Sequence, residues 1–181
     1  MFAVTPRLLL RPGWPEDADA LFAAINDQAI VRNLARAPWP YSLQDAQQFL
    51  SLPAQPARWL IFSRTLASPQ LLGCIGIDRL EDHSIELGYW IARPHWGQGY
   101  ATEAGRAVLE TARALGHQCL VASHFVDNPA SGTVLHKLGF KPTGQTTRRF
   151  SLGRDQHSDA IEYICVLDEK PECELMPKIA A

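Results

Sequence analysis

The sequence predicts a single mixed α/β domain in which strands alternate with amphipathic helices. Residues 85–91 alternate between apolar and polar or small side chains, as expected of a half-buried strand. Residues 101–115 carry apolar side chains at spacings of three and four, as expected of a helix that packs on a core. A length of 181 residues, without an internal repeat or linker, suits one domain with a substantial core.

The remaining elements follow from the same patterns, and prolines and glycines mark their ends. Pro15 and Pro129 suit the first turns of helices, whereas Gly116 and Gly139 suit helix C-termini. Ser42 is the predicted N-cap of a further helix. In order, we expect a strand at 7–11, helices at 16–26 and 42–50, a hairpin of strands at 59–66 and 71–80, a strand at 84–91, a helix at 101–115, a strand at 119–126, a short helix from 129 and a hairpin of strands at 144–152 and 160–167.

The composition excludes several classes of function. The net charge of −2 provides no basic field for nucleic acid. No apolar run reaches the ~20 residues of a membrane span, and the N-terminus lacks a signal-peptide pattern, so we expect a cytoplasmic protein without a membrane partner. The four cysteines and six histidines show no metal-ligand spacing, so no metal site is expected. We expect residues 1–168 to form the domain and residues 169–181 to be a loose tail.

The turn between the strand at 84–91 and the helix at 101–115 is the most informative feature. Gly97 and Gly99 lack side-chain bulk, so the backbone can approach a ligand closely. The helix that follows begins with unpaired amides and the positive end of its dipole. This arrangement predicts a phosphate-binding turn.

Two other phosphate-binding motifs do not fit this turn. The chain has no lysine-containing P-loop, and position 102, where the third glycine of a dinucleotide-binding motif would fall, is Thr102. An ordinary tight turn between a buried strand and a helix would explain the turn if it stood alone. A second block at residues 127–140, with a strand that ends in Asp127-Asn128-Pro129 and a short helix that ends at Gly139, argues against that interpretation.

Together, these two blocks resemble the GNAT superfamily of acyl-CoA N-acyltransferases. Segments 5–12, 15–18 and 41–46 are similar to the branch that contains the ribosomal-protein N-terminal-alanine acetyltransferases. The resemblance covers nearly the whole chain. It implies a central, mostly antiparallel twisted sheet that is splayed at the acetyl-CoA site and flanked by helices, and it implies transfer of an acetyl group from acetyl-CoA to a primary amine.

The resemblance also implies how coenzyme A is held. Backbone amides of the turn and the first helical residues would bind the pyrophosphate. The end of the preceding strand, near Trp90 and Ile91, would pair by its backbone with the pantetheine arm, and an exposed N–H there would polarise the thioester carbonyl. Trp96 stands where the family usually has Arg or Gln, which costs little because the binding groups are main chain. The cofactor-binding candidates are Trp90, Ile91, Gly97, Gln98, Gly99, Tyr100, Ala101, Thr102, Asn128 and Ser131.

Amine acetylation needs a group that takes the proton of the amine. Glu86 is the candidate, directly or through a water, because it shares a strand face with Trp90 and lies just before the cofactor region. We expect burial against aromatic side chains to raise its pKa. A solvent-facing Glu86 without a catalytic role is the alternative, and Asp78 and His83 are weaker candidates for the base.

The leaving thiolate needs a hydrogen-bond or proton donor. Many GNAT proteins place a tyrosine in the helix after the Asn-Pro motif, but the matching position here is Leu135. Ser131 is the nearest hydroxyl, and helix-start capping is its alternative role. Asn128 resembles the family's asparagine that contacts the pantetheine arm, although an asparagine before proline is also a turn former.

The acceptor pocket is expected between the first two helices and their loop. Asn33, Trp39 and Tyr41, with Trp14 as a further candidate, would line it, or the aromatic residues would only fix a proline-rich loop to the core. The acceptor is either a peptide or protein N-terminus or a small-molecule amine. A non-catalytic acyl-CoA-binding regulatory module is the alternative function. A monomer and a homodimer both fit the sequence.

Overall fold

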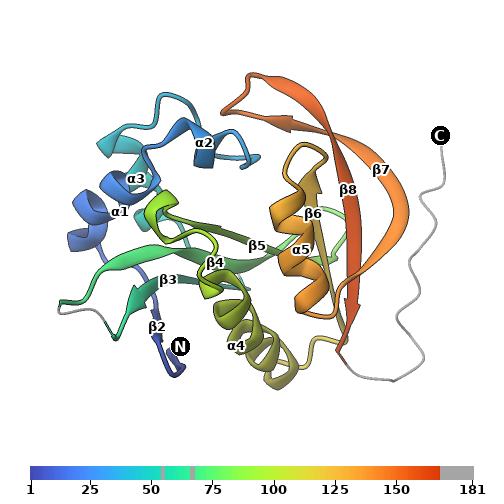
Figure 1. Ribbon diagram of the computed structural model, residues 1–181, viewed down its shortest axis with the longest axis horizontal. Helices are drawn as coiled ribbons and strands as arrows, with labels where there is room; N and C mark the ends of the chain where they lie inside the picture. Colours follow the sequence, from blue (N-terminus) through green and yellow to red (C-terminus); the bar gives the residue numbers. More distant parts are fainter. Residues whose placement is uncertain (54–55, 66–67, 168–181) are drawn as a thin grey trace.

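The computed structural model describes residues 1–53, 56–65 and 68–167 (Figure 1). The predicted loose tail at 169–181 therefore lies outside the described residues. The elements are β1 (Ala3–Val4), β2 (Leu8–Arg11), a 3-10 helix η1 (Pro15–Asp17), α1 (Ala18–Ile25), α2 (Gln28–Val31), α3 (Leu43–Ser51), β3 (Pro56–Ser63), β4 (Leu71–Arg79), β5 (Ile85–Ile91), a second 3-10 helix η2 (Arg93–His95), α4 (Tyr100–Ala114), β6 (Cys119–Phe125), α5 (Pro129–Lys137), β7 (Lys141–Ser151) and β8 (Gln156–Val166).

One eight-stranded sheet organises the domain. Its strand order is β1-β2-β3-β4-β5-β6-β8-β7, and every neighbouring pair is antiparallel except β5 and β6. A parallel pair needs a crossover connection, and α4 provides it. The predicted fold class, a mostly antiparallel sheet flanked by helices and splayed at one place, is confirmed.

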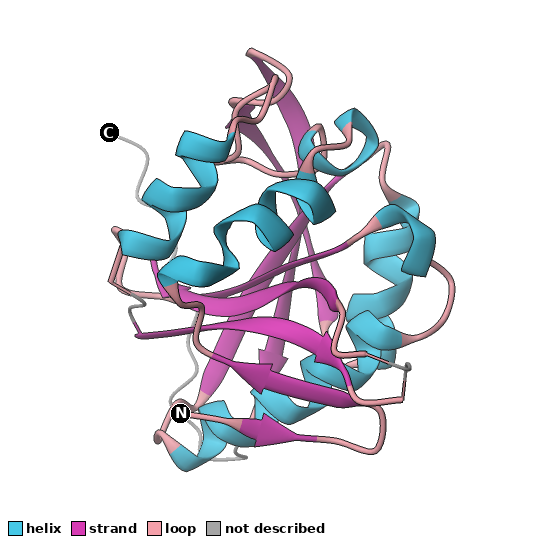
Figure 2. Ribbon diagram, turned by 90° about the vertical axis from the view of Figure 1, so that its left-hand side faces the viewer, coloured by secondary structure: helices cyan, strands magenta, loops and turns pink. Residues whose placement is uncertain are grey.

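Helices cover both faces of the sheet (Figure 2). On one face, α4 and α5 bury a core in which Val108 of α4 and Leu135 of α5 meet the strands. On the other face, α1, α2 and α3 cover a second core that includes Trp90. Successive side chains of β5 point to opposite faces of the sheet, as the alternation in the sequence predicts. Leu87 lies in the first core and Trp90 lies in the second.

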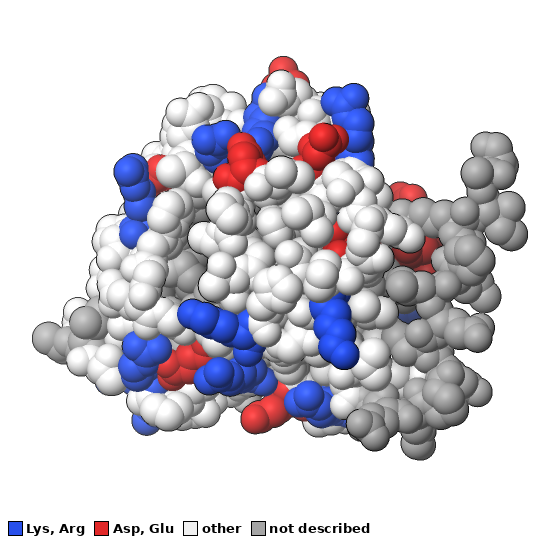
Figure 3. All heavy atoms as spheres, turned by 45° about the vertical axis from the view of Figure 1, so that its right-hand side comes forward, with Lys and Arg blue, Asp and Glu red and all other residues white. Residues whose placement is uncertain are grey.

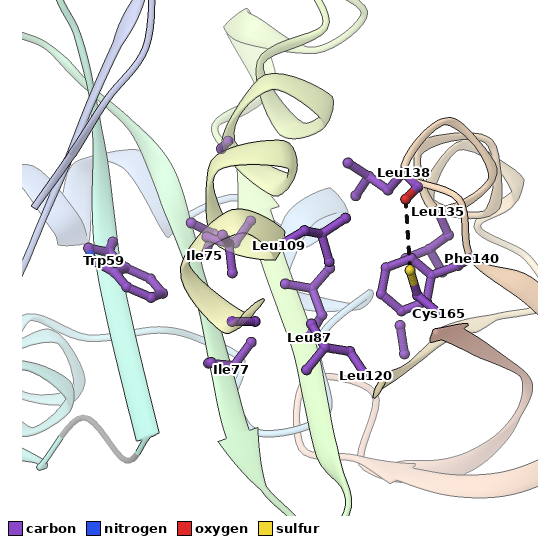
Figure 4. Close-up of a cluster of buried hydrophobic side chains, with 14 of the residues drawn as sticks. Trp59, Ile75, Ile77, Leu87, Leu109, Leu120, Leu135, Leu138, Phe140 and Cys165 are labelled. Atoms are coloured by element: carbon purple, nitrogen blue, oxygen red, sulfur yellow. Dashed lines mark hydrogen bonds between the residues drawn. The ribbon is translucent and has the colours of Figure 1, made fainter. Parts of the chain in front are cut away.

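The first core joins the two halves of the sheet (Figure 4). Leu109 of α4 lies beside Leu87 of β5, and Phe140 and Cys165 close the core beneath α5. The Cys165 thiol lies 4.0 Å from the carbonyl oxygen of Leu138. These contacts anchor both helices, and therefore fix where their N-terminal ends lie relative to the strands.

Several element boundaries differ from the prediction. A 3-10 turn precedes α1, and the short helix α2 was not predicted, because four residues carry too little periodicity to reveal a helix. Strand β7 begins at Lys141 instead of residue 144, since a bulge between Pro142 and Thr146, which contains Gly144 at φ 81°, lets the strand continue. Leu115 is exposed because the helix ends before it.

A stability prediction follows from two glycines on neighbouring strands. A Cβ atom at Gly73 of β4 would lie 2.2 Å from the backbone oxygen of Trp90, whereas nothing lies within 4 Å of a Cβ at Gly88 of β5. We expect Gly73→Ala to lower the free energy of unfolding by about 1–3 kcal/mol, because the backbone must shift. Urea denaturation checks this, with Gly88→Ala as the matched control. Equal effects of the two variants would contradict the packing argument.

Candidate active site

The strands β5 and β6 separate near the middle of the sheet. Their register contains a single pair, Glu86 with Val121, and beyond it no pairing joins them. On its other side β5 remains paired with β4 up to Ile91. The C-terminal half of β5 therefore presents one backbone edge that no strand of the sheet covers, and this opening is the centre of the candidate site.

The backbone groups of this edge alternate along β5. The amide of Ala92 donates to Leu72 of β4 over 2.7 Å, so the alternate residue Trp90 also turns its backbone toward β4. Tyr89 and Ile91 turn theirs to the open side, where the indole N–H of Trp96 donates to the Ile91 carbonyl over 2.6 Å. Two strand positions, Trp90 and Ile91, were expected to contact the pantetheine arm by their backbone. The backbone of Ile91 faces the opening, whereas that of Trp90 faces β4. The backbone of Tyr89, which was not expected there, also faces the opening.

The glycine-rich turn lies at the end of β5 and leads into α4. Gly97 and Gly99 have φ values of 72° and 81°, which only glycine adopts at little cost. The first helical hydrogen bond runs from the amide of Glu103 to the Gly99 carbonyl, so the amides of residues 100–102 have no partner within the helix. These amides lie beside the exposed Gln98 at the positive end of the dipole of a fifteen-residue helix, an arrangement that suits an anion.

Glu103 and Arg7 brace this turn from the side. The carboxylate of Glu103 accepts hydrogen bonds from Thr5 at 2.6 Å and from the Arg7 side chain at 2.6 Å. Burial opposes ionisation, yet these hydrogen bonds prevail and hold the pKa of Glu103 below its ordinary value. Arg7 also donates to the Gln98 carbonyl over 3.0 Å. The loop between β1 and β2 thus supports the glycine-rich turn.

The start of α5 lies across the opening from β5. Asn128 is its N-cap, but the side chain makes no capping hydrogen bond, which leaves the amide group for a ligand. The Ser131 hydroxyl does not cap the helix either, because it lies 2.8 Å from the hydroxyl of Tyr89. Leu135, at the position of the family's usual tyrosine, is buried in the core.

Glu86 is half-buried, and its carboxylate is paired rather than free. Arg149 of β7 donates to both carboxylate oxygens, with 3.3 Å between Arg149 Nη2 and Glu86 Oε2, and Ser123 of β6 donates to Oε1 over 3.3 Å. The hydrogen bonds to Glu86 raise the pKa of Arg149. The partners of Glu86 are therefore Arg149 and Ser123, and not the aromatic side chains expected from the sequence.

A second charged cluster ties three segments together beside the opening. Asp127, which precedes the Asn-Pro motif, accepts hydrogen bonds from Arg154 of the β7–β8 turn at 2.7 and 2.9 Å and from Arg32 at the end of α2 at 2.8 Å. Arg154 also donates to Asn33 over 3.3 Å. Ser151 donates to the Leu34 carbonyl over 2.8 Å. The tip of the β7–β8 hairpin is thereby fixed to α2.

The predicted acceptor residues lie in different surroundings. Asn33 belongs to the charged cluster, Tyr41 is buried in the second core, and Trp39 is 37% exposed. Burial raises the pKa of Tyr41 to about 12. Trp14, the further candidate, lies under the guanidinium of Arg11 at 3.9 Å. Among the described residues, no hydrogen bond or ion pair links any of these four side chains to Glu86, whose partners are Arg149 and Ser123.

Sequence reasoning missed Tyr89, Ser123, Arg149 and Arg154 as members of the site. Tyr89 reads as a core residue from strand alternation, and Arg149 reads as a solvent-facing residue of an edge strand. The curvature of the long β7–β8 hairpin, visible at the right of Figure 1, brings Arg149 to β5, and no local pattern in the sequence encodes it.

The surface and the helices of the described residues add two observations. Acidic and basic side chains are interspersed on the face shown in Figure 3, without a patch of a single sign. No helix in the described part of the chain is long and apolar enough to cross a membrane, and no group of three or more His, Cys, Asp or Glu residues there could hold a metal ion.

Comparison with known proteins assigns the family. Residues 7–141 match the model of the acetyltransferase (GNAT) domain. The chain belongs to the GNAT acetyltransferase family. An uncharacterised N-acetyltransferase of Bacillus subtilis, YoaA, is 32% identical over 148 residues, which cover 77% of this chain and 82% of the relative.

Two further relatives of this GNAT chain agree with the assignment. The ribosomal-protein-serine acetyltransferase of Escherichia coli is 29% identical over 104 residues, which cover 56% of this chain and 58% of the relative. A GNAT acetyltransferase from Bacillus anthracis has the same fold, with a TM-score of 0.80 and 21% identity over 93% of this chain and all of the other. The chain is thus an N-acetyltransferase with acetyl-CoA as its cosubstrate.

The cluster around Asp127 generates a prediction about acid stability. The Arg154 guanidinium holds the pKa of Asp127 below its ordinary value of 3.8. Because the pKa is lower in the folded state, the carboxylate stabilises the fold above the unfolded-state pKa, and this contribution is lost as the pH falls through the folded-state pKa. Asp127→Asn should lower the free energy of unfolding by about 1 kcal/mol at neutral pH, since the Asp127 side chain is 45% exposed and solvent screens the pair, and by less near pH 3.

Urea denaturation of both proteins at the two pH values measures this difference. Asp159→Asn is the matched control, because Asp159 and Arg148 are both exposed and lie 3.9 Å apart, and it should change little. A deficit of Asp127→Asn that stays constant down to pH 3 would show that the charge of the aspartate is not what stabilises the hairpin tip.

Proposed function

We propose that this acetyltransferase acetylates the α-amino group of a peptide or protein N-terminus, which reaches the thioester at the open edge of β5. The observation that carries the site assignment is the uncovered edge of β5, which leads through η2 to the glycine turn and faces the start of α5. The choice of acceptor is supported by the E. coli relative, whose name describes acetylation of a ribosomal protein.

The amine approaches from the face of β5 that α1, α2 and α3 cover in part. Gly88 lies there between Glu86 and Trp90, and the space beside it is open. Paired charges surround it, namely Glu86 with Arg149 and Asp78 with Arg36 at 2.6 Å. Such a polar surround suits the backbone of a peptide, which brings amides as well as its terminal amine.

The backbone of β5 and the turn hold the cosubstrate. The amides of residues 97–102 bind the pyrophosphate, and the Asn128 side chain contacts the pantetheine arm. The N–H of Tyr89 or Ile91 donates to the thioester carbonyl and stabilises the oxyanion that forms when the amine attacks. The C–S bond then breaks, its electron pair leaves on sulfur, and the amine nitrogen gives up a proton.

We assign that proton to Glu86, by way of a water. A carboxylate has about four acceptor positions. Arg149 Nη1 and Ser123 occupy two positions at Oε1, and Arg149 Nη2 occupies one at Oε2. One position at Oε2 is left for a water that bridges to the amine. Arg149 fixes the orientation of the carboxylate in this arrangement.

The acceptor is identified by thiol release from acetyl-CoA with a panel of amines: peptides that begin with Ser or Ala, polyamines, free amino acids and aminoglycosides. Turnover with the peptides alone supports the proposal. Turnover with a small amine instead would contradict the proposed peptide acceptor, although the protein would still be an N-acetyltransferase.

Glu86→Gln tests the proton acceptor. We expect turnover to fall by about 100-fold, because the amide cannot take the proton, with little change in the affinity for coenzyme A. Steady-state kinetics and calorimetry measure the two quantities. Asp78→Asn is the competing variant, because Asp78 pairs with Glu86 in the sheet register and also carries an arginine partner. A larger loss in Asp78→Asn than in Glu86→Gln would transfer the role to Asp78.

Gly99→Val tests the phosphate-binding turn. Gly99 and Gly116 lie at the two ends of α4 with nearly equal φ values of 81° and 82°, so valine introduces similar backbone strain at either position. Only Gly99 belongs to the proposed binding turn. We expect Gly99→Val to abolish binding of coenzyme A in calorimetry, whereas Gly116→Val should bind normally. If Gly99→Val still bound coenzyme A, the turn would not be part of the binding site.

A further inference from the structure

Tyr89 connects the two sides of the opening. Its backbone belongs to β5, and its hydroxyl lies 2.8 Å from Ser131 Oγ and 3.2 Å from the Ser131 carbonyl oxygen on α5. Tyr89 is partly buried and its ring packs against the first core. Both polar contacts of its hydroxyl are to Ser131. The family's usual tyrosine position, Leu135, lies one helical turn further along α5.

The two hydroxyls can share their protons in two ways. In the first, Tyr89 donates to the Ser131 carbonyl and Ser131 donates to Tyr89. In the second, Tyr89 donates to Ser131 Oγ, and the proton of Ser131 is free to point elsewhere. Both arrangements satisfy the tyrosine hydroxyl, so the change between them leaves no buried polar group unpaired.

We propose that Tyr89 is a positioning residue that turns the Ser131 hydroxyl toward the sulfur as the thiolate departs. This inference rests on the proposed function of the opening. When the C–S bond breaks, negative charge appears on sulfur, and the second arrangement lets Ser131 donate a hydrogen bond to it. No proton leaves Tyr89 or Ser131 in this step. The sulfur departs as thiolate, and the proton released in the reaction is the one lost by the amine.

The environment of Tyr89 suits a donor that keeps its proton. Burial raises the pKa of Tyr89 to about 12, so its hydroxyl remains a hydrogen-bond donor at neutral pH. A second buried tyrosine lies against the same helix but on the side of β8. There, Tyr163 of β8 packs under Gly132 and contacts His124 at 3.3 Å.

Kinetics of Tyr89→Phe, Ser131→Ala and the double variant test the proposal. We expect Ser131→Ala to lower kcat at least about tenfold and Tyr89→Phe to lower it roughly fivefold, each with an unchanged KM for acetyl-CoA. The double variant should be no slower than Ser131→Ala, because Tyr89 acts only through Ser131. The proposal would be overturned if the kcat loss of the double variant were the product of the two single losses, or if kcat were unchanged in Tyr89→Phe.

Tyr163→Phe is the matched control, since it removes a buried tyrosine hydroxyl next to the same helix but outside the opening. Its kcat should equal that of the wild type, and thermal unfolding of all variants should show whether a loss of stability explains a loss of rate. A wild type that neither binds coenzyme A nor turns over would refute the proposed site itself. A wild type that turns over while Tyr89→Phe keeps its full rate would refute only the role of Tyr89.

Discussion

The parallel pairing of β5 and β6 is the constraint on which the rest of the molecule depends. A parallel pair requires a crossover, and the crossover helix α4 must begin where β5 ends. The N-terminal amides of α4 and the uncovered edge of β5 therefore meet at one place. Helix amides that suit a phosphate and a strand edge that suits an extended chain lie together because of the topology, without any side chain needing to bring them there.

The same separation would weaken the domain if nothing bridged it. The first core passes beneath the opening, and α4 and α5 bury apolar side chains from both halves of the sheet. On the opposite face, the β7–β8 hairpin returns to the first half through Arg149 with Glu86 and through Arg154 with Asn33. Apolar packing under α4 and α5 joins the two halves of the sheet on one face, and charged hydrogen bonds join them on the other face. The opening is therefore lined by polar groups on one face only.

The sequence predicted the regular elements well, because alternation in β5 and the three- and four-residue spacing in α4 are local patterns. It also located the glycine turn and the Asn-Pro block. It did not reveal the partners of Glu86 and Ser131, since Arg149 and Tyr89 reach them through hairpin curvature and strand order. The role of Glu103 was not revealed either, for a similar reason: its partners Thr5 and Arg7 are distant in sequence.

Strand β6 has a further consequence for how the protein is made. It pairs with β5 at one residue pair, but with β8 along its whole length, and β8 is the last strand in the described part of the chain. On the ribosome, β6 emerges well before the strand that holds it, so the growing chain exposes both edges of β6 for a time. The wall of the opening that carries Asn128 and Ser131 is thus completed only once β8 has emerged, after the wall formed by β5.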